Sequence, residues 1–90
     1  MSCYVDPMQD TTPSKRWPYK QFCHLICENS PELDAIAARI GLDPRWKQNP
    51  NTPSEHYDLT AQRRLLAIGQ GAIPVSVRHM GGMLWGKRFS

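Results

Sequence analysis

The sequence has little of what a membrane or exported protein needs. No uninterrupted apolar run exceeds a few residues, whereas a transmembrane helix needs about 20. The opening stretch, MSCYVDPMQD, carries acids where a signal peptide has positive charge and an apolar core. We therefore expect a cytoplasmic protein that has no membrane partner.

Cysteine is also scarce. Cys3, Cys23 and Cys27 are odd in number and have no recognised disulfide spacing, which predicts reduced thiols. Cys23 and Cys27 together with His24 are too tightly spaced for a zinc site, and a fourth ligand is missing. We interpret Cys23 and Cys27 as buried thiols on one face of a strand.

The glycine-containing motifs of many enzymes are missing. The chain has no P-loop, no dinucleotide-binding fingerprint and no nucleophile elbow, and the glycines of GQGAIP (residues 69–74) follow a helix and do not open one. A chain of 90 residues also excludes a two-domain enzyme with a separate substrate lobe. We expect no cofactor and no bound metal.

Acidic residues are absent from the last third of the chain. Residues 1–59 hold all eight acids and six bases, a balance of −2, whereas residues 60–90 hold five bases and no acid. Those five are Arg63, Arg64, Arg78, Lys87 and Arg88. This asymmetry predicts an anionic partner (a nucleotide, a nucleic acid or an acidic protein surface), unless the charges only keep a small protein soluble.

Prolines and glycines divide the chain into short elements that alternate between strand and helix. Aromatic, β-branched and alternating side chains predict strands over 2–6, 21–27, 55–59 and 72–77, with proline-rich loops over 7–20 and 43–54. Pro74 places the last strand at an edge or a bulge. The order β-β-α-β-α-β-(α) predicts one small α/β domain over residues 1–90, with a three- to four-stranded sheet and two or three helices.

The helices are predicted from their caps and their apolar spacing. The first starts with Ser30 as N-cap and Pro31 in its first turn, and Gly41 ends it. Thr60 caps the second, which runs to about residue 70. Its expected core side is Leu65, Ile68 and Ala72. A last helix over 77–86 is weakened by the glycines at 81 and 82.

Four polar side chains are predicted to meet in one cleft. Strand alternation puts His56 and Asp58 on one face, Asp6 ends the first strand, and His24 lies within the second. As a catalytic group they would bind a divalent metal and activate water. They would otherwise hydrogen-bond the sugar or base of a nucleotide, or serve only as structural residues.

Arg63 and Arg64 are an electrostatic anomaly. They fall in the first turn of the second predicted helix, where the helix dipole disfavours cations. Either Asp58 or a bound anion at that helix N-terminus should compensate.

Basic and aromatic residues alternate in both long loops: Lys15-Arg16-Trp17, Tyr19-Lys20 and Arg45-Trp46-Lys47. This mixture suits stacking on a base beside a phosphate. It also suits a protein-binding hot spot, and Trp17 and Trp46 are alternatively lids on a thin core. The predicted ligand-binding residues are Lys20, Trp46, His56, Asp58, Arg63 and Arg64.

Several short motifs occur in a characteristic order. They are Tyr4-Val5-Asp6, Cys23-His24-Leu25, ARIGL at 38–42, Arg45-Trp46, His56-Tyr57-Asp58-Leu59, the arginine pair and Gly71-Ala72. From about residue 3 to residue 77 the chain resembles the small bacterial and phage proteins grouped as the domain of unknown function DUF4031. The proline-rich segment before Tyr19 and the glycines at 81 and 82 depart from that pattern.

The resemblance implies positions, not a mechanism. Those that match the family pattern are Asp6, His24, Trp46, His56, Asp58 and Arg64. The occurrence of such proteins in phages implies, by analogy, a modulator of host systems.

Our first hypothesis is a non-catalytic module that binds a nucleotide or nucleic acid. Lys20 and the arginine pair contact phosphate, Trp46 stacks, and Asp6, His56 and Asp58 hold the polar end. The alternatives are a metal-assisted phosphodiesterase or nuclease that uses Asp6, His24, His56 and Asp58, and an inhibitor that binds a host protein. A thin core also makes a homodimer an expectation.

Overall fold

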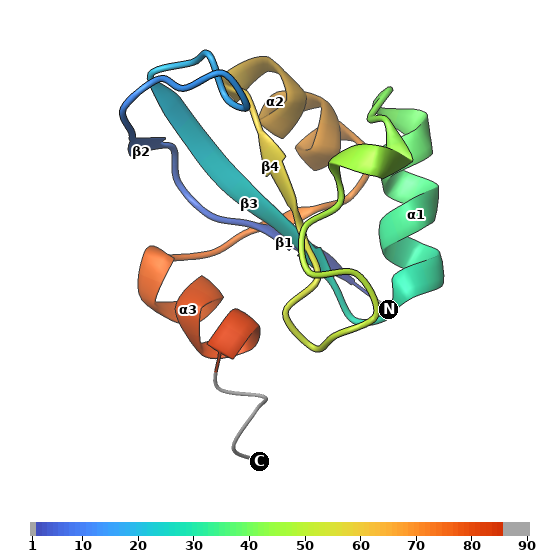
Figure 1. The fold of residues 1–90 in the computed structure, drawn as a ribbon. Coiled ribbons are helices and arrows are strands. Elements are labelled where there is room, and N and C mark those ends of the chain that lie inside the picture. The colour runs from blue at the N-terminus through green and yellow to red at the C-terminus, as the bar shows by residue number, and fades with distance from the viewer. Residues whose placement is uncertain (1, 86–90) are drawn as a thin grey trace.

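A five-stranded mixed sheet lies at the centre of the structure, a computed structural model that describes residues 2–85 (Figure 1). The strands are β1 (Cys3–Val5), β2 (Gln9–Asp10), β3 (Gln21–Cys27), β4 (Tyr57–Leu59) and β5 (Ile73–Pro74). The helices are α1 (Ser30–Arg39), the 3-10 turn η1 (Pro44–Trp46), α2 (Ala61–Gly69) and α3 (Val77–Trp85). A small α/β domain is therefore confirmed, with three α-helices in the part of the chain described.

The longest strand, β3, organises the sheet. Because β1 and β4 both pair antiparallel with β3, from opposite sides, they run in the same direction. The last strand, β5, pairs parallel with β1, so Pro74 lies at an edge as predicted. Residue 6 and residue 60 therefore follow β1 and β4 at the same end of the sheet.

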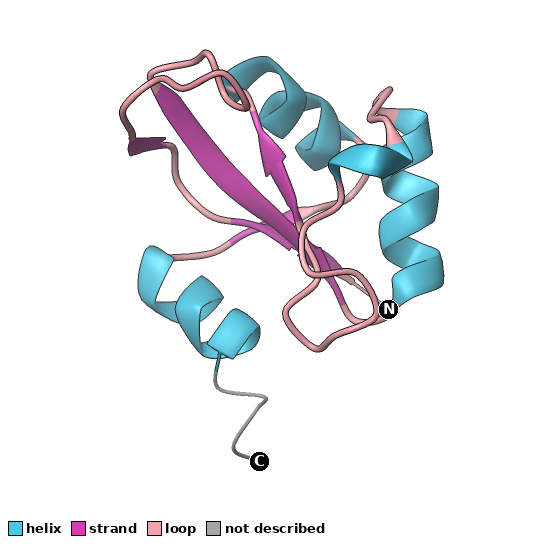
Figure 2. Cartoon of the chain, viewed as in Figure 1, coloured by secondary structure: helices cyan, strands magenta, loops and turns pink. Residues whose placement is uncertain are grey.

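The predicted loop over residues 7–20 contains a short strand that the sequence does not reveal. In Figure 2 this strand, β2, is the short separate arrow near the end at which β3 begins, where Asp10 pairs with Gln21. Val5 pairs with Leu25 and Gln9 pairs with Phe22, so three residues of one strand oppose two of the other, which is a bulge. The predicted sheet of three or four strands is too small for this reason. The strands β1, β4 and β5 are shorter than predicted, whereas β3 spans the predicted residues 21–27.

Helices cover both faces of the sheet. Cys23 and Leu25 of β3 belong to the main core, together with apolar residues of α1 and α2. On the opposite face Ile26 packs against Met80 and Leu84 of α3. Alternation along β3 therefore separates two layers of side chains, and α3 covers the face on which the predicted polar residues lie.

Two details of the predicted helices are wrong. The N-cap of α1 is Asn29, whose side chain accepts from the backbone N–H of Glu32 at 2.9 Å, while the Ser30 hydroxyl donates to Glu55. Leu65 of α2 is 68% exposed, and the buried position is Ala67, because the helix turns its Ala67 side toward β3. Thr60 caps α2 as predicted, and Gly41 follows α1 with a φ of 79° that suits glycine.

The expectation of three reduced thiols is wrong for two of them. Cys3 and Cys27 are direct partners across β1 and β3, and they form a disulfide. Their separation of 24 residues matches no motif, so only the strand register brings them together. Cys23 is a buried free thiol, as predicted.

No helix within residues 2–85 is long and apolar enough to cross a membrane. The basic residues Lys87 and Arg88, and residue 86 at the predicted end of the last helix, lie outside the described part of the chain.

Candidate functional site

The bulge after β1 positions a buried carboxylate. Asp6 is 1% exposed, and its side chain accepts from the His24 backbone N–H at 2.6 Å and from Gln9 Nε2 at 2.8 Å. Its Oδ2 also lies 2.9 Å from His24 Nδ1. The carboxylate therefore replaces the ladder contact that the bulge removes, and it orients the His24 ring.

Three further groups meet beside Asp6 on the same sheet face. His24 and Asp58 are direct partners across β3 and β4, and His56 precedes Asp58 by two residues, so its side chain points to the same side. One ligand atom from each of His24, His56 and Asp58 lies within 4.8 Å of the others. The structure thus brings Asp6, His24, His56 and Asp58 together, as the sequence predicts. We call these four residues the polar cluster.

Hydrogen bonds also fix the His56 ring. Its Nδ1 lies 2.9 Å from the Ser54 carbonyl oxygen, and its Nε2 lies 3.5 Å from Asp58 Oδ1. Burial opposes protonation of His56, but the contacts with Asp58 and with the Ser54 carbonyl outweigh it and raise its pKa above the ordinary value. Ser54 contacts the His56 ring through its backbone carbonyl, so no motif in the sequence indicates this contact.

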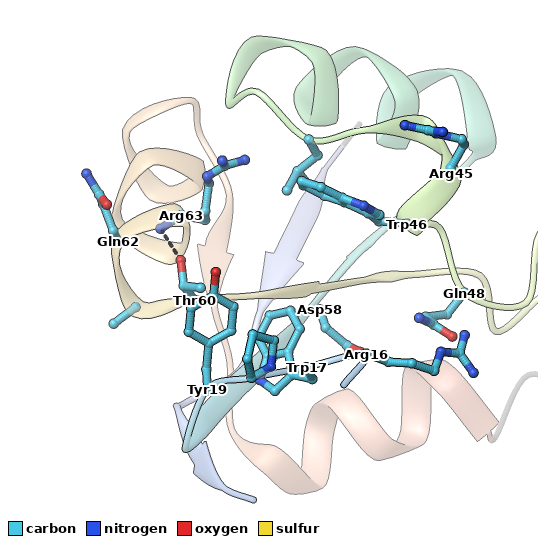
Figure 3. A pocket seen from close by; sticks show the side chains of 13 residues that line it. Arg16, Trp17, Tyr19, Arg45, Trp46, Gln48, Asp58, Thr60, Gln62 and Arg63 are labelled. Carbon is cyan, nitrogen blue, oxygen red and sulfur yellow. Dashed lines mark hydrogen bonds between the residues drawn. The ribbon is translucent and has the colours of Figure 1, made fainter. Parts of the chain in front are cut away.

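An open hollow of about 840 Å³ adjoins the cluster through Asp58. Figure 3 shows Trp46 on one side of this hollow, and Trp17 and Tyr19 on the other, with Asp58 between them. Trp46 is 53% exposed and Tyr19 is 50% exposed. Large aromatic surfaces therefore face open space and do not lie within the core.

Trp17 is held in place on its side of the hollow. Its indole N–H donates to the Gln21 carbonyl at 3.1 Å, and its ring meets that of Tyr19 edge to face with centroids 5.0 Å apart. The loop that carries both rings is further tied down by a backbone bond from Ser14 to the Trp17 carbonyl at 2.9 Å. This wall of the hollow is preformed.

Three arginines line the hollow, and they differ in how their charge is used. Arg45 is paired with Asp43, with Nη2 and Oδ2 2.7 Å apart. Arg63 Nη1 donates to the Gly41 carbonyl at 2.7 Å. Within residues 2–85 no acid forms an ion pair with Arg16 or Arg63, so these two contribute net positive charge to the hollow.

The arginine pair contacts backbone carbonyls and not the predicted Asp58 carboxylate. Arg64 Nε donates to the backbone carbonyl of Asp6 at 2.8 Å, and Arg63 bonds the carbonyl of Gly41, which follows α1. In the described part of the chain Asp58 pairs with His56 and with neither arginine. Carbonyl dipoles, one of them just past the C-terminal end of α1, therefore contact both guanidinium groups. The predicted bound anion stays a prediction.

The predicted ligand-binding residues divide into three groups. Trp46, Asp58 and Arg63 line the hollow, and His56 adjoins it through Asp58. Lys20 and Arg64 are not among its lining residues. Arg16, Trp17 and Tyr19 were absent from the predicted set, although the alternation of basic and aromatic residues in their loop indicated them. Gln48 and Gln62 also line it, without any signal in the sequence.

A family comparison agrees with the motif order. Residues 3–86 match the family described as protein of unknown function, DUF4031. The comparisons with curated proteins and with solved structures found no match. The family match covers nearly the whole chain and continues past residue 77 into α3, so the resemblance seen in the sequence is confirmed and the chain belongs to the DUF4031 family.

Proposed function

We propose that this domain binds a nucleotide, either free or within a single-stranded nucleic acid, in the hollow between Trp46 and Trp17. The observation that carries the proposal is the lining itself, in which exposed aromatic rings and arginines surround one open space. Its volume of about 840 Å³ lies in the range of small-molecule sites, roughly 300–1,000 Å³.

Each part of the lining suits one part of a nucleotide. Trp46, with Trp17 and Tyr19 opposite, offers flat surfaces on which a base stacks. Arg16 and Arg63, which no described acid neutralises, supply charge for phosphate. Gln48 and Asp58 offer hydrogen-bond partners for the sugar or for a base edge.

Thermal melts with AMP, ATP, adenosine, inorganic triphosphate and a short oligodeoxythymidine test this proposal. A ligand at 100 times its Kd adds about 2.7 kcal/mol of stability. We expect nucleotides or the oligonucleotide to raise Tm, with adenosine and triphosphate each weaker than ATP. A steep loss of binding with salt identifies the nucleic acid, because each phosphate contact on a single strand contributes about −0.7 to the log–log slope.

Variants separate this site from general attraction to a basic protein. Trp46→Ala should weaken binding by about 1–3 kcal/mol through lost stacking, and Arg63→Ala should weaken it as well. Arg78→Ala is the matched control, because Arg78 lies exposed on α3, away from the lining. Equal losses in all three variants, or no melting shift with any of these compounds, contradict the proposal.

A metal-assisted phosphodiesterase is the second candidate. It is favoured because Asp58 belongs both to the hollow and to the polar cluster, so a phosphate in the hollow would lie close to His24 and His56. Cleavage of bis-p-nitrophenyl phosphate with added Mn²⁺ or Zn²⁺, and its loss in Asp58→Asn, would support this candidate. Absence of cleavage under all metal conditions leaves the binding module.

A further inference from the structure

We propose that His24, His56 and Asp58 bind one divalent transition-metal ion. This inference stands on the polar cluster and does not depend on nucleotide binding. His24 on β3 and Asp58 on β4 are direct partners, and His56 immediately precedes β4. One ligand atom of each lies within 4.8 Å of the others. Ligands about 2.0–2.2 Å from a common ion are separated by about 3–4 Å, so only small side-chain movements close the site.

The hydrogen bonds of both rings leave the same nitrogen available. His24 Nδ1 faces the Asp6 carboxylate at 2.9 Å, and His56 Nδ1 faces the Ser54 carbonyl at 2.9 Å. Both partners are acceptors, so each Nδ1 carries the hydrogen and each neutral ring presents its Nε2 lone pair. Metal-binding histidines are typically oriented in this way by a carboxylate or a carbonyl.

The remaining contact between His56 and Asp58 points to a cation. In the neutral ring the Nε2 lone pair faces Asp58 Oδ1 at 3.5 Å, which sets one acceptor against another. A proton on His56 satisfies this one contact. An ion satisfies it together with the second lone pair, on His24, whose ring centroid lies 5.1 Å from that of His56.

The donor set selects the class of ion. Two imidazoles and one carboxylate suit Zn²⁺, Mn²⁺, Fe²⁺, Co²⁺ or Ni²⁺, whereas Mg²⁺ and Ca²⁺ prefer all-oxygen sites. The Cys23 thiol lies on the opposite face of β3, in the main core, and supplies no sulfur ligand. Three protein ligands leave positions for water or an anion, as open metal sites do, and the Asp58 ligand borders the hollow.

The test uses the tag-free full chain after treatment with EDTA. Calorimetric titration with Zn²⁺ and absorption spectra with Co²⁺ measure affinity, stoichiometry and ligand geometry. We expect one ion per chain, a raised Tm with Zn²⁺, and little response to Mg²⁺. Asp58→Asn and His56→Gln should each weaken binding at least tenfold, whereas His79→Gln, an exposed histidine of α3 outside the cluster, should bind as the wild type does.

Asp6→Asn probes the positioning of His24. In this variant the asparagine side chain at position 6 can place its NH2 group, a donor, against His24 Nδ1. The His24 tautomer with hydrogen on Nε2 is then favoured, and Nε2 has no free lone pair for the ion. Loss of an outer partner of this kind costs about 10–100-fold in affinity, and the Co²⁺ spectrum should change in the same variant. The proposal is overturned if the wild type binds no ion stoichiometrically, if Asp58→Asn and His56→Gln bind as tightly as the wild type while circular dichroism shows them folded, or if only His79→Gln loses the ion.

Discussion

Replacing Arg64 by methionine should destabilise the domain, whereas the same change at Arg63 should leave its stability almost unchanged. Both substitutions remove a cation from the first turn of α2, and the helix dipole alone then predicts a gain of about 0.3–1 kcal/mol for each. Each substitution also removes a hydrogen bond from the guanidinium group to a backbone carbonyl, which opposes this gain. The burial of these two bonds differs and decides the net change in stability.

Arg64 makes the more valuable contact. Its Nε donates at 2.8 Å to the part-buried carbonyl of Asp6, at the bulge that leads from β1 to β2. A bond from a charged donor contributes about 1.5–3 kcal/mol, so the net loss in Arg64→Met is about 1–2 kcal/mol. Because 1 kcal/mol shifts Tm by about 4–8 °C in a domain of this size, we expect a drop of roughly 4–16 °C.

Arg63 is the matched comparison. Its bond to the Gly41 carbonyl is exposed to solvent, so its loss is expected to cancel against the dipole gain. Methionine keeps most of the apolar stem in both variants, so the comparison isolates the guanidinium. Urea unfolding at pH 7, followed by circular dichroism, gives both free energies. Equal stabilities of the wild type and Arg64→Met, or a larger loss in Arg63→Met, would refute this reasoning.

Two further outcomes follow from buried groups. Glu55→Ala should cost about 1–3 kcal/mol, because this buried carboxylate accepts from the Ser30 hydroxyl and from the Asn51 backbone N–H at 3.0 Å, and urea unfolding measures the loss. Burial raises the pKa of the Cys23 thiol to about 12 from 9.0, so its contribution to stability is complete below pH 9 and declines as the pH rises toward 12. Non-reduced protein should accordingly show no thiol reactive to Ellman's reagent when native at pH 8 and one in urea; a thiol that reacts at once in the native protein contradicts this burial.

The parts of the fold that depend on regular alternation were predictable from the sequence. Strand period placed His56 and Asp58 on one face, and the same rule put His24 opposite the core thiol Cys23. Caps and turn residues likewise gave the second helix at Thr60. These patterns are local in the sequence, and several neighbouring residues contribute to each of them.

The parts that depend on register and long reach were not predictable. The Cys3–Cys27 disulfide and strand β2 both follow from how β1 and its continuation align with β3, and a two-residue strand carries no period. Arg64 reaches a carbonyl 58 residues away in the sequence, and a backbone acceptor leaves no trace in residue types. The apolar spacing of α2 predicted Leu65 in the core, yet Leu65 is exposed and Ala67 is the buried residue of this helix.

The bulge at Asp6 links the stability of the domain to its candidate chemistry. Its extra residue interrupts the ladder and leaves a buried carboxylate free to orient His24. Arg64 holds the backbone of that same residue. Arg64→Met should therefore loosen a metal at His24, His56 and Asp58 although Arg64 touches none of these ligands. Arg63 contacts the hollow and not the bulge, so its loss should affect the nucleotide and spare the metal. The two adjacent arginines thus divide between the two candidate sites.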